Sequence, residues 1–275
     1  MRRQPSEPRS ARMVGLATAL AIGACAALFA APFAHAQDVE GLVVYFPFDE
    51  GAGATVSDPR GTGHTGAMLG DVTWSRGQYG GGVDFGGEDG HIRVPHHPDF
   101  NFTEGITVAM WIRPTLTLGV GIWQILAAKG KDTSEFFEVL INPAGLVWMA
   151  WRLSEKRITP EQSPKLIRPK EWQHVAVSYQ IDEWWTVYLN GEVLVDHDDE
   201  GQHLVPNADD LLLGVEEPLD LKWFYNGEMD EFVLYDRGLT QTEIKAVQRG
   251  VENLPVYAEG TTPTRWGALK AGYAR

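Results

Sequence analysis

YFPFDEG at Tyr45–Gly51 is matched near the other end of the chain by FYNGEMDEF at Phe224–Phe232. Each stretch joins a strand-like apolar run to a pair of carboxylates, which includes Asp49 in the first and Asp230 in the second. In a closed two-sheet fold the first and last strands are commonly neighbours. The sequence therefore predicts a sandwich whose two ends meet, with acidic residues at the junction.

Short β-rich runs, separated by Gly, Pro, Asn and Asp, fill the chain between these two stretches. The run ITVAMWI at 106–112 alternates, which places Ile106, Val108, Met110 and Ile112 on one face. Asn190-Gly191 between two apolar runs is typical of a type I′ hairpin. These patterns predict an all-β fold, a two-sheet antiparallel β-sandwich or jelly roll.

One segment has a helical pattern. Thr240-Gln241-Thr242-Glu243 has the spacing of a capping box, and Gly250 suits a left-handed stop. We expect one short C-terminal helix over Thr240–Arg249. The further strands that we expect lie near Leu42–Phe48, Ala67–Trp74, Gly82–Phe85, His91–Val94, Trp123–Ala128, Phe136–Ile141, Leu146–Leu153, Trp172–Ile181, Trp184–Leu189, Leu211–Leu213 and Glu228–Tyr235.

Residues 1–36 have the pattern of a secretory signal peptide. Four arginines precede an Ala-rich apolar run that ends at Ala34-His35-Ala36, which favours cleavage after Ala36. Two alternatives stay open, a lipidated Cys25 and an uncleaved membrane anchor. We expect a secreted or cell-envelope protein with one domain over 37–250 and a tail over 251–275.

Charge and cysteine usage limit the partners. Without residues 1–36 the chain keeps 239 residues, a formal net charge of −17 and no cysteine. Such an acidic surface repels phosphate backbones and anionic lipid, so nucleic acid is excluded as a partner.

An exported domain without cysteine cannot use disulfides, so packing and a bound metal are the remaining means of stabilisation.

Glu228 and Asp230 are the best candidates for catalysis, because residues two apart in a strand share a face. Retaining glucanases of the jelly-roll type need a third carboxylate shortly after such a pair, as the general acid. Phe232 and Val233 occupy those positions here. The sequence thus predicts no enzyme, with a glycan hydrolase or lyase as the alternative.

A calcium site at the junction of the two acidic stretches suits these residues better. Asp49 and Asp230 would meet there, and Asp58 lies in a Gly-rich loop that could fold over the same edge. Calcium takes six to eight oxygen ligands, which carboxylates and carbonyls supply. The alternative is that these carboxylates only accept hydrogen bonds from loop amides.

Two other metal motifs are incomplete. DHDDEG at Asp196–Gly201 resembles the start of a calcium loop, but Asn207 stands where the closing Glu belongs, which favours a solvated turn. His91, His96 and His97 have no CxxC or HExxH partner, which favours no metal there.

Ten tryptophans favour binding by flat aromatic surfaces. Alternation in 146–152 and 184–190 leaves four side chains for an outward-facing ligand-binding patch, namely Trp148, Arg152, Trp184 and Tyr188. Core packing remains the alternative for any single aromatic residue.

Taken in order, these motifs resemble the laminin-G-like jelly-roll domains of the concanavalin A-like lectin/glucanase superfamily. The resemblance covers Val39–Arg249, and further motifs that carry it are Asp58–His64, Gly77–Phe85, Trp172–Ala176 and Tyr188–Gly191. It implies two antiparallel sheets packed face to face, no intrinsic activity, and a structural calcium near Asp49 and Asp230. The insert at Thr159–Lys170 departs from the short hairpin loop usual at this place.

We therefore expect an exported, non-catalytic module that binds polysaccharide or extracellular protein and holds a structural calcium ion. A structural cell-envelope protein that binds no sugar is a further alternative.

Overall fold

The computed structural model describes residues 40–115, 122–131, 136–152, 157–158, 167–198, 204–217 and 223–251, with backbone alone at 148–152 and 157–158. The chain divides into two units, 1–34 and 35–275, and the described residues belong to the second. The predicted signal peptide, Cys25 and the tail beyond Val251 lie outside them. Within the described part of the chain, no helix is long and apolar enough to span a bilayer.

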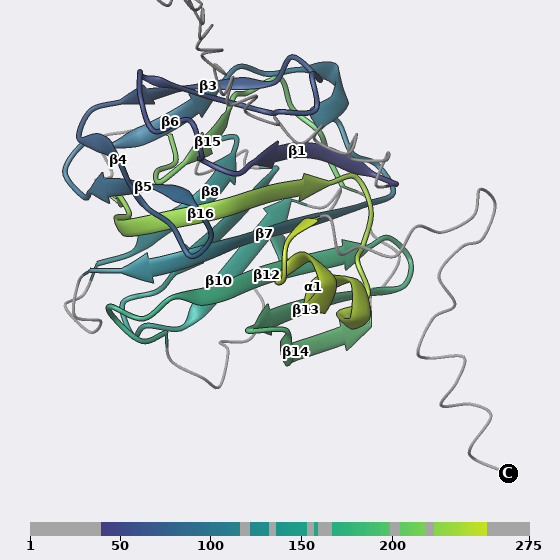
Figure 1. The fold of residues 1–275 in the computed structure, drawn as a ribbon. Coiled ribbons are helices and arrows are strands. Elements are labelled where there is room, and N and C mark those ends of the chain that lie inside the picture. Colours follow the sequence, from purple (N-terminus) through teal and green to yellow (C-terminus); the bar gives the residue numbers. More distant parts are fainter. Residues whose placement is uncertain are drawn as a thin grey trace, which may run out of the picture. The chain divides into compact units, whose positions relative to one another are not determined.

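Two antiparallel sheets of eight strands each form a sandwich, as the sequence predicted (Figure 1). Sheet A has the order β14-β13-β12-β7-β16-β5-β4, with β1 also paired to β16. Its strands are β1 (Leu42–Phe46), β4 (Val72–Arg76), β5 (Gly81–Gly86), β7 (Gly105–Pro114), β12 (Gln173–Gln180), β13 (Trp184–Leu189), β14 (Glu192–Asp198) and β16 (Asn226–Tyr235).

Sheet B has the order β11-β10-β9-β8-β15-β6-β3-β2. Its strands are β2 (Thr55–Ser57), β3 (Thr65–Leu69), β6 (His91–Val94), β8 (Gln124–Lys129), β9 (Phe137–Ile141), β10 (Val147–Arg152), β11 (Arg157–Ile158) and β15 (Leu211–Leu213). The 3-10 helix η1 (Pro98–Phe100) and the α-helix α1 (Gln241–Val247) complete the described fold.

The main core lies between the sheets and is built by alternation. Ile106, Val108, Met110 and Ile112 of β7 all point into it, which confirms the predicted face. Facing side chains of sheet B, such as Val139 of β9, belong to the same apolar cluster. Removal of this apolar surface from water is the main source of stability in a chain with this fold.

The two ends of the fold meet in sheet A, as predicted. β1 pairs antiparallel with β16, and Phe46 lies opposite Phe232, with ring centroids 6.2 Å apart. A bulge interrupts the pairing of β16 with β7 after Asp230, where Glu231 adopts a φ of 52°. The extra residue changes the directions in which the Asp230 and Glu231 side chains point.

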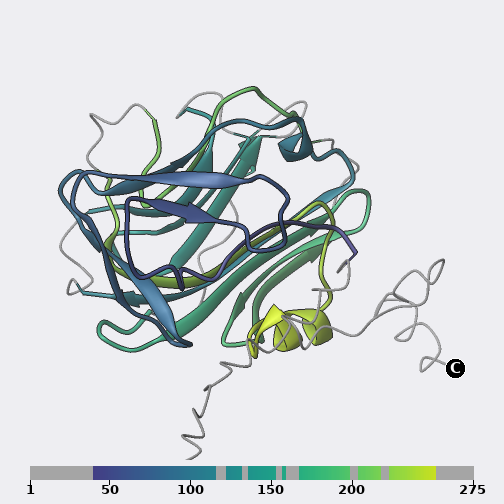
Figure 2. The ribbon, with the colours of Figure 1, turned by 45° about the horizontal axis from the view of Figure 1, so that its top comes forward.

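Helix α1 covers part of the outer side of sheet A (Figures 1 and 2). Thr240 is its N-cap, and the capping box with Glu243 is complete, as the sequence predicted. Ile244 and Val247 pack on Ala176, Tyr188 and Val233 of the sheet. Residues that alternate outward on the covered strands are therefore buried.

Two predicted segments are wrong in detail. The run Ala67–Trp74 is not one strand, because Gly70, with a φ of +66°, turns the chain between β3 of sheet B and β4 of sheet A. Asp196–Asp198 is not part of a solvated turn but belongs to β14, where the Asp196 carboxylate accepts a hydrogen bond from the Thr186 hydroxyl (2.7 Å).

The type I′ turn predicted at Asn190 and Gly191 is present, with φ of 52° and 74°, and it returns the chain so that β14 pairs with β13.

Candidate functional site

Asp49 and Asp230 meet on one glycine-rich loop, Gly77–Gly81. The Asp230 carboxylate accepts hydrogen bonds from the amides of Tyr79 (2.9 Å) and Glu231 (2.8 Å), and Asp49 accepts one from Gly81 (2.6 Å). A Cβ on Gly77 would lie 2.5 Å from the Asp230 Oδ2 atom, so only glycine lets the loop approach this closely. The loop therefore bridges two carboxylates that are far apart in sequence.

The two carboxylates differ in burial. Asp230 is fully buried, and no basic side chain of the described residues pairs with it, whereas Asp49 is exposed. Burial, with a smaller contribution from Asp49, raises the pKa of Asp230 to about 7, although the amides of Tyr79 and Glu231 oppose the shift. A buried carboxylate without a cation is costly, and a bound cation would remove that cost.

Asp58 does not join this pair, and the prediction that it would is corrected. Its carboxylate accepts hydrogen bonds from the Arg60 guanidinium, the shortest at 2.5 Å, and from the Tyr45 amide (3.0 Å). The negative charge is thus already compensated. Among the described residues, the carboxylate oxygens of Asp49, Asp58 and Asp230 do not form a group of three close enough to share an ion.

The carboxylates that suggested catalysis are engaged in other interactions. Glu228 forms an ion pair with Arg113, whose Nη2 donates to Glu228 Oε1 at 2.6 Å. Glu231 accepts a hydrogen bond from the Tyr45 hydroxyl (3.0 Å). Asp230 lies against the loop amides, so Glu228 and Asp230 do not present two free carboxylates to one substrate.

The predicted aromatic patch is divided between the sheets. Trp148 and Arg152 lie in β10 of sheet B, and their side chains are outside the described residues. Trp184 and Tyr188 lie in β13 of sheet A. Trp184 is half-buried, but the prediction that Tyr188 is exposed is wrong, because α1 covers it and leaves the residue 3% exposed.

The outer face of sheet B, opposite the main core, carries a polar hollow that the sequence reasoning missed. Its volume is about 170 Å³ and its lining includes Arg93, Asp210, Leu212 and Glu217. Arg93 donates to Asp210 Oδ2 and to Glu217 Oε1, both at 2.9 Å. These residues come from β6 and from the segments flanking β15, and no local motif links them.

Two half-buried tryptophans lie on the same face of sheet B. Trp123 and Trp223 have ring centroids 6.1 Å apart and pack on Ile125, Ala128 and Leu140. Ala128 is the cross-strand neighbour of Leu212, which lines the hollow. The outer face of sheet B therefore combines a charged hollow with an aromatic pair.

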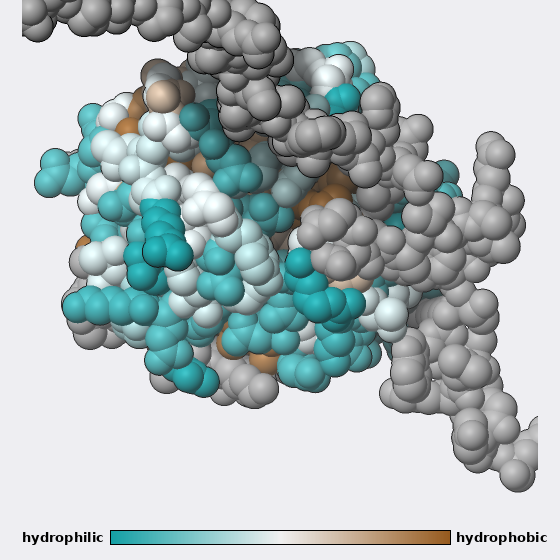
Figure 3. All heavy atoms as spheres, in the orientation of Figure 1, coloured by the Kyte–Doolittle hydropathy of each residue, from teal (hydrophilic) through white to brown (hydrophobic). Residues whose placement is uncertain are grey.

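The outer side of sheet A offers less for a ligand. In the view of Figure 3 the described residues are mostly hydrophilic or neutral, and apolar residues show only in small areas. Trp111 on this side is buried, and its indole donates to the Gln248 carbonyl (3.2 Å). This tryptophan therefore ties the C-terminal end of α1 to the sheet.

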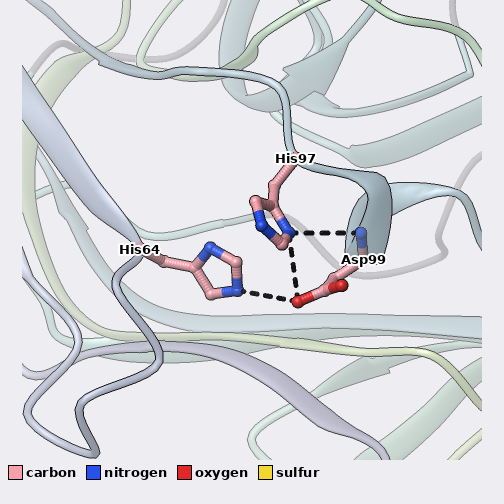
Figure 4. A group of neighbouring side chains, drawn as sticks. All are labelled: His64, His97 and Asp99. Atoms are coloured by element: carbon pink, nitrogen blue, oxygen red, sulfur yellow. Dashed lines mark hydrogen bonds and ion pairs between the residues drawn. The ribbon is translucent and has the colours of Figure 1, made fainter.

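A third cluster joins His64, His97 and Asp99 (Figure 4). The His64 Nε2 atom lies 3.5 Å from Asp99 Oδ2, and the His97 Nδ1 atom lies 3.1 Å from the same oxygen. The residues come from the loop before β3 and from η1 with its N-cap. Sequence reasoning missed the cluster because His64 lies far from His97 along the chain.

Comparison with known proteins places this fold. The family model described as the concanavalin A-like lectin/glucanases superfamily matches residues 85–245. The chain belongs to this superfamily. The resemblance drawn from the sequence is thereby confirmed. No curated protein matches the chain in sequence.

Solved structures share the fold at low sequence identity. The binding domain of Paraclostridial Mosquitocidal Protein 1 matches with a TM-score of 0.63 and 17% identity, over 76% of this chain and 52% of that domain. The binding domain of botulinum neurotoxin DC, in complex with rat synaptotagmin II, matches with a TM-score of 0.62 and 10% identity, over 77% and 52%. This concanavalin A-like chain thus spans about half the length of the toxin binding domains.

Domain 4 of AbnA, an extracellular arabinanase from Geobacillus stearothermophilus, was solved in complex with arabinotriose. It matches with a TM-score of 0.58 and 18% identity, over 75% of this chain and 98% of that domain. These neighbours are two toxin binding domains and one domain of an arabinanase, and no enzyme family is identified for the concanavalin A-like chain.

Proposed function

We propose that this protein is an exported, non-catalytic module that binds a glycan through the outer face of sheet B. The observation that carries the proposal is the combination of the Arg93 hollow with the Trp123–Trp223 pair on one sheet face. Flat aromatic rings stack on the apolar faces of sugars, and an Arg held between two carboxylates presents both donors and acceptors to hydroxyl groups.

The size of the hollow limits what enters it. At about 170 Å³ it is smaller than the roughly 300–1,000 Å³ typical of pockets for drug-sized ligands. One sugar ring or one polar substituent fits it, while the rest of an extended glycan would lie along the sheet toward the tryptophans. Relatives of this fold bind arabinotriose in one case and a synaptotagmin in another, so protein is the second class of partner.

We also propose that a structural calcium ion binds at Asp49 and Asp230. Supporting this, Asp230 is a fully buried carboxylate that pairs with no basic side chain among the described residues, and Asp49 accepts a hydrogen bond from the same glycine-rich loop. Carboxylate and loop carbonyl oxygens are the ligands that calcium prefers. Such an ion would tie β16 to the segment after β1, where the two ends of the fold meet.

A glycan array, probed with the purified protein with and without calcium, tests the function. We expect binding to a set of related polysaccharides, loss of that binding in Trp223→Ala, and no release of reducing sugar from any bound glycan. The matched control is Trp184→Ala, which removes a half-buried tryptophan from the other sheet. If the protein bound no glycan on the array but captured a defined surface protein, the ligand would be a protein and not a glycan.

A further inference from the structure

His64, His97 and Asp99 form a cluster of metal-ligating atoms that neither the glycan face nor the calcium site uses. One donor atom from each side chain lies within 4.8 Å of the other two. Figure 4 shows the two imidazole rings directed at the Asp99 carboxylate from different segments of the chain. This is the only such group of three among the residues that the structure describes.

The two distances from Asp99 Oδ2 to the imidazole nitrogens match a small tetrahedral ion. Zinc–nitrogen and zinc–oxygen bonds of about 2.0–2.1 Å place the ligand atoms of a tetrahedral site roughly 3.3–3.4 Å apart. The distances from Asp99 Oδ2 are 3.1 Å to His97 Nδ1 and 3.5 Å to His64 Nε2, on either side of that value. Small shifts of exposed side chains would therefore complete the geometry.

The type of ligand also selects the metal. Two imidazoles with one carboxylate suit zinc and neighbouring transition metals, whereas calcium and magnesium prefer oxygen ligands alone. This donor set differs from the one at Asp49 and Asp230, so the two sites would take different ions.

The surroundings hold one ligand in place and leave the others accessible. The His64 side chain is 5% exposed, and its ring packs on Phe100 with centroids 5.0 Å apart. His97 and Asp99 have half-exposed side chains, and the hydrogen bond from the Asp99 amide to His97 Nδ1 is long, at 3.3 Å. Metal binding through His97 Nδ1 would break this weak contact.

We propose that His64, His97 and Asp99 bind a zinc ion with three protein ligands, leaving a fourth position open to water or to a partner. The ion ties the loop before β3 to η1. Because η1 stands in sequence between β6 of sheet B and β7 of sheet A, the ion fixes the crossing from one sheet to the other.

Titration of metal-free protein without a histidine tag tests the proposal. We expect one zinc ion per chain, and a rise in Tm of about 5 °C when free zinc exceeds the Kd by a hundredfold. Cobalt should give the visible absorption of a tetrahedral site. His97→Ala and Asp99→Asn, both at exposed positions, should each weaken zinc binding by at least tenfold.

Two controls make the result specific. His197→Gln changes a histidine on β14 of the other sheet and should bind zinc like the wild type. Asp230→Asn should also keep the zinc response, since it alters only the proposed calcium site. Absence of zinc binding in the wild type, or equal binding in His97→Ala and Asp99→Asn, would show that the cluster is only a His–Asp hydrogen-bond group.

Discussion

The variant Asp230→Asn distinguishes two roles for this residue. Either Asp230 is a calcium ligand, or its carboxylate only accepts hydrogen bonds from loop amides. Asparagine keeps the shape of the side chain and removes its charge. In the metal-free protein, burial raises the pKa of Asp230 from 3.8 to about 7. The folded state then holds more protons than the unfolded state between about pH 4 and pH 7, so ionisation of this group lowers stability as pH rises across that window.

The magnitude follows from the shift. At about 1.4 kcal/mol for each pH unit, ionised Asp230 costs the metal-free fold roughly 4 kcal/mol above pH 7. Asparagine avoids this cost, but its amide group cannot accept from both Tyr79 and Glu231, which costs about 1–3 kcal/mol. We therefore expect Asp230→Asn to be more stable than the wild type by about 1–3 kcal/mol in chelator at pH 8, which corresponds to a rise in Tm of roughly 3–10 °C.

Calcium should reverse this order. Thermal melts of both proteins, in chelator and in millimolar calcium from pH 4 to pH 8, measure the effect. The wild type should gain several degrees from calcium and Asp230→Asn should gain none. Asp49→Asn, an exposed control, should change little in chelator yet also lose the calcium response. An Asp230→Asn variant less stable than the wild type in chelator at pH 8, or one that still responds to calcium, would refute the reasoning.

Three other predictions concern stability. His174 is buried and neutral, with its pKa lowered by burial to about 3, so the fold should lose stability as pH falls from 6.5 toward 3, and His174→Gln should weaken that dependence in urea unfolding at several pH values. Thr240→Ala removes the N-cap of α1 and should cost about 1 kcal/mol, seen as a Tm lower by roughly 2–4 °C, while an unchanged melt would mean that the cap is dispensable. Phe232→Ala leaves a cavity beside Phe46 where the ends of the fold meet and should cost about 3–5 kcal/mol in urea unfolding; a cost below 1 kcal/mol would contradict the packing.

Much of the fold could be predicted because local patterns decide it. The alternation in β7, the turn at Asn190 and Gly191, and the capping box at Thr240 each have a short-range physical cause, and the structure confirms all three. The pairing of β1 with β16 followed from the closure of a sandwich. The split of Ala67–Trp74 between two sheets escaped prediction because a turn at Gly70 interrupts an otherwise continuous pattern.

The sites were harder because they depend on contacts between distant segments. The alternation correctly predicted that the Tyr188 side chain points away from the main core, but it could not show that α1 covers that side of the sheet. Arg60 lies two residues from Asp58 and forms an ion pair with it. This nearby basic residue was a sequence signal against Asp58 as a metal ligand. The Arg93 hollow and the His64–His97–Asp99 cluster are each formed by segments that are far apart in the sequence, so no local spacing predicts them.

The central claim, that the outer face of sheet B binds a glycan, is tested most directly by one affinity comparison. Calorimetric titration of the strongest array ligand would be performed on the wild type, Arg93→Ala and Arg168→Ala, the last replacing an arginine with a 70% exposed side chain outside the hollow. The account predicts at least a tenfold weaker Kd for Arg93→Ala, with an unchanged melt, and a wild-type Kd for Arg168→Ala. Equal affinity of all three proteins would place the binding surface elsewhere.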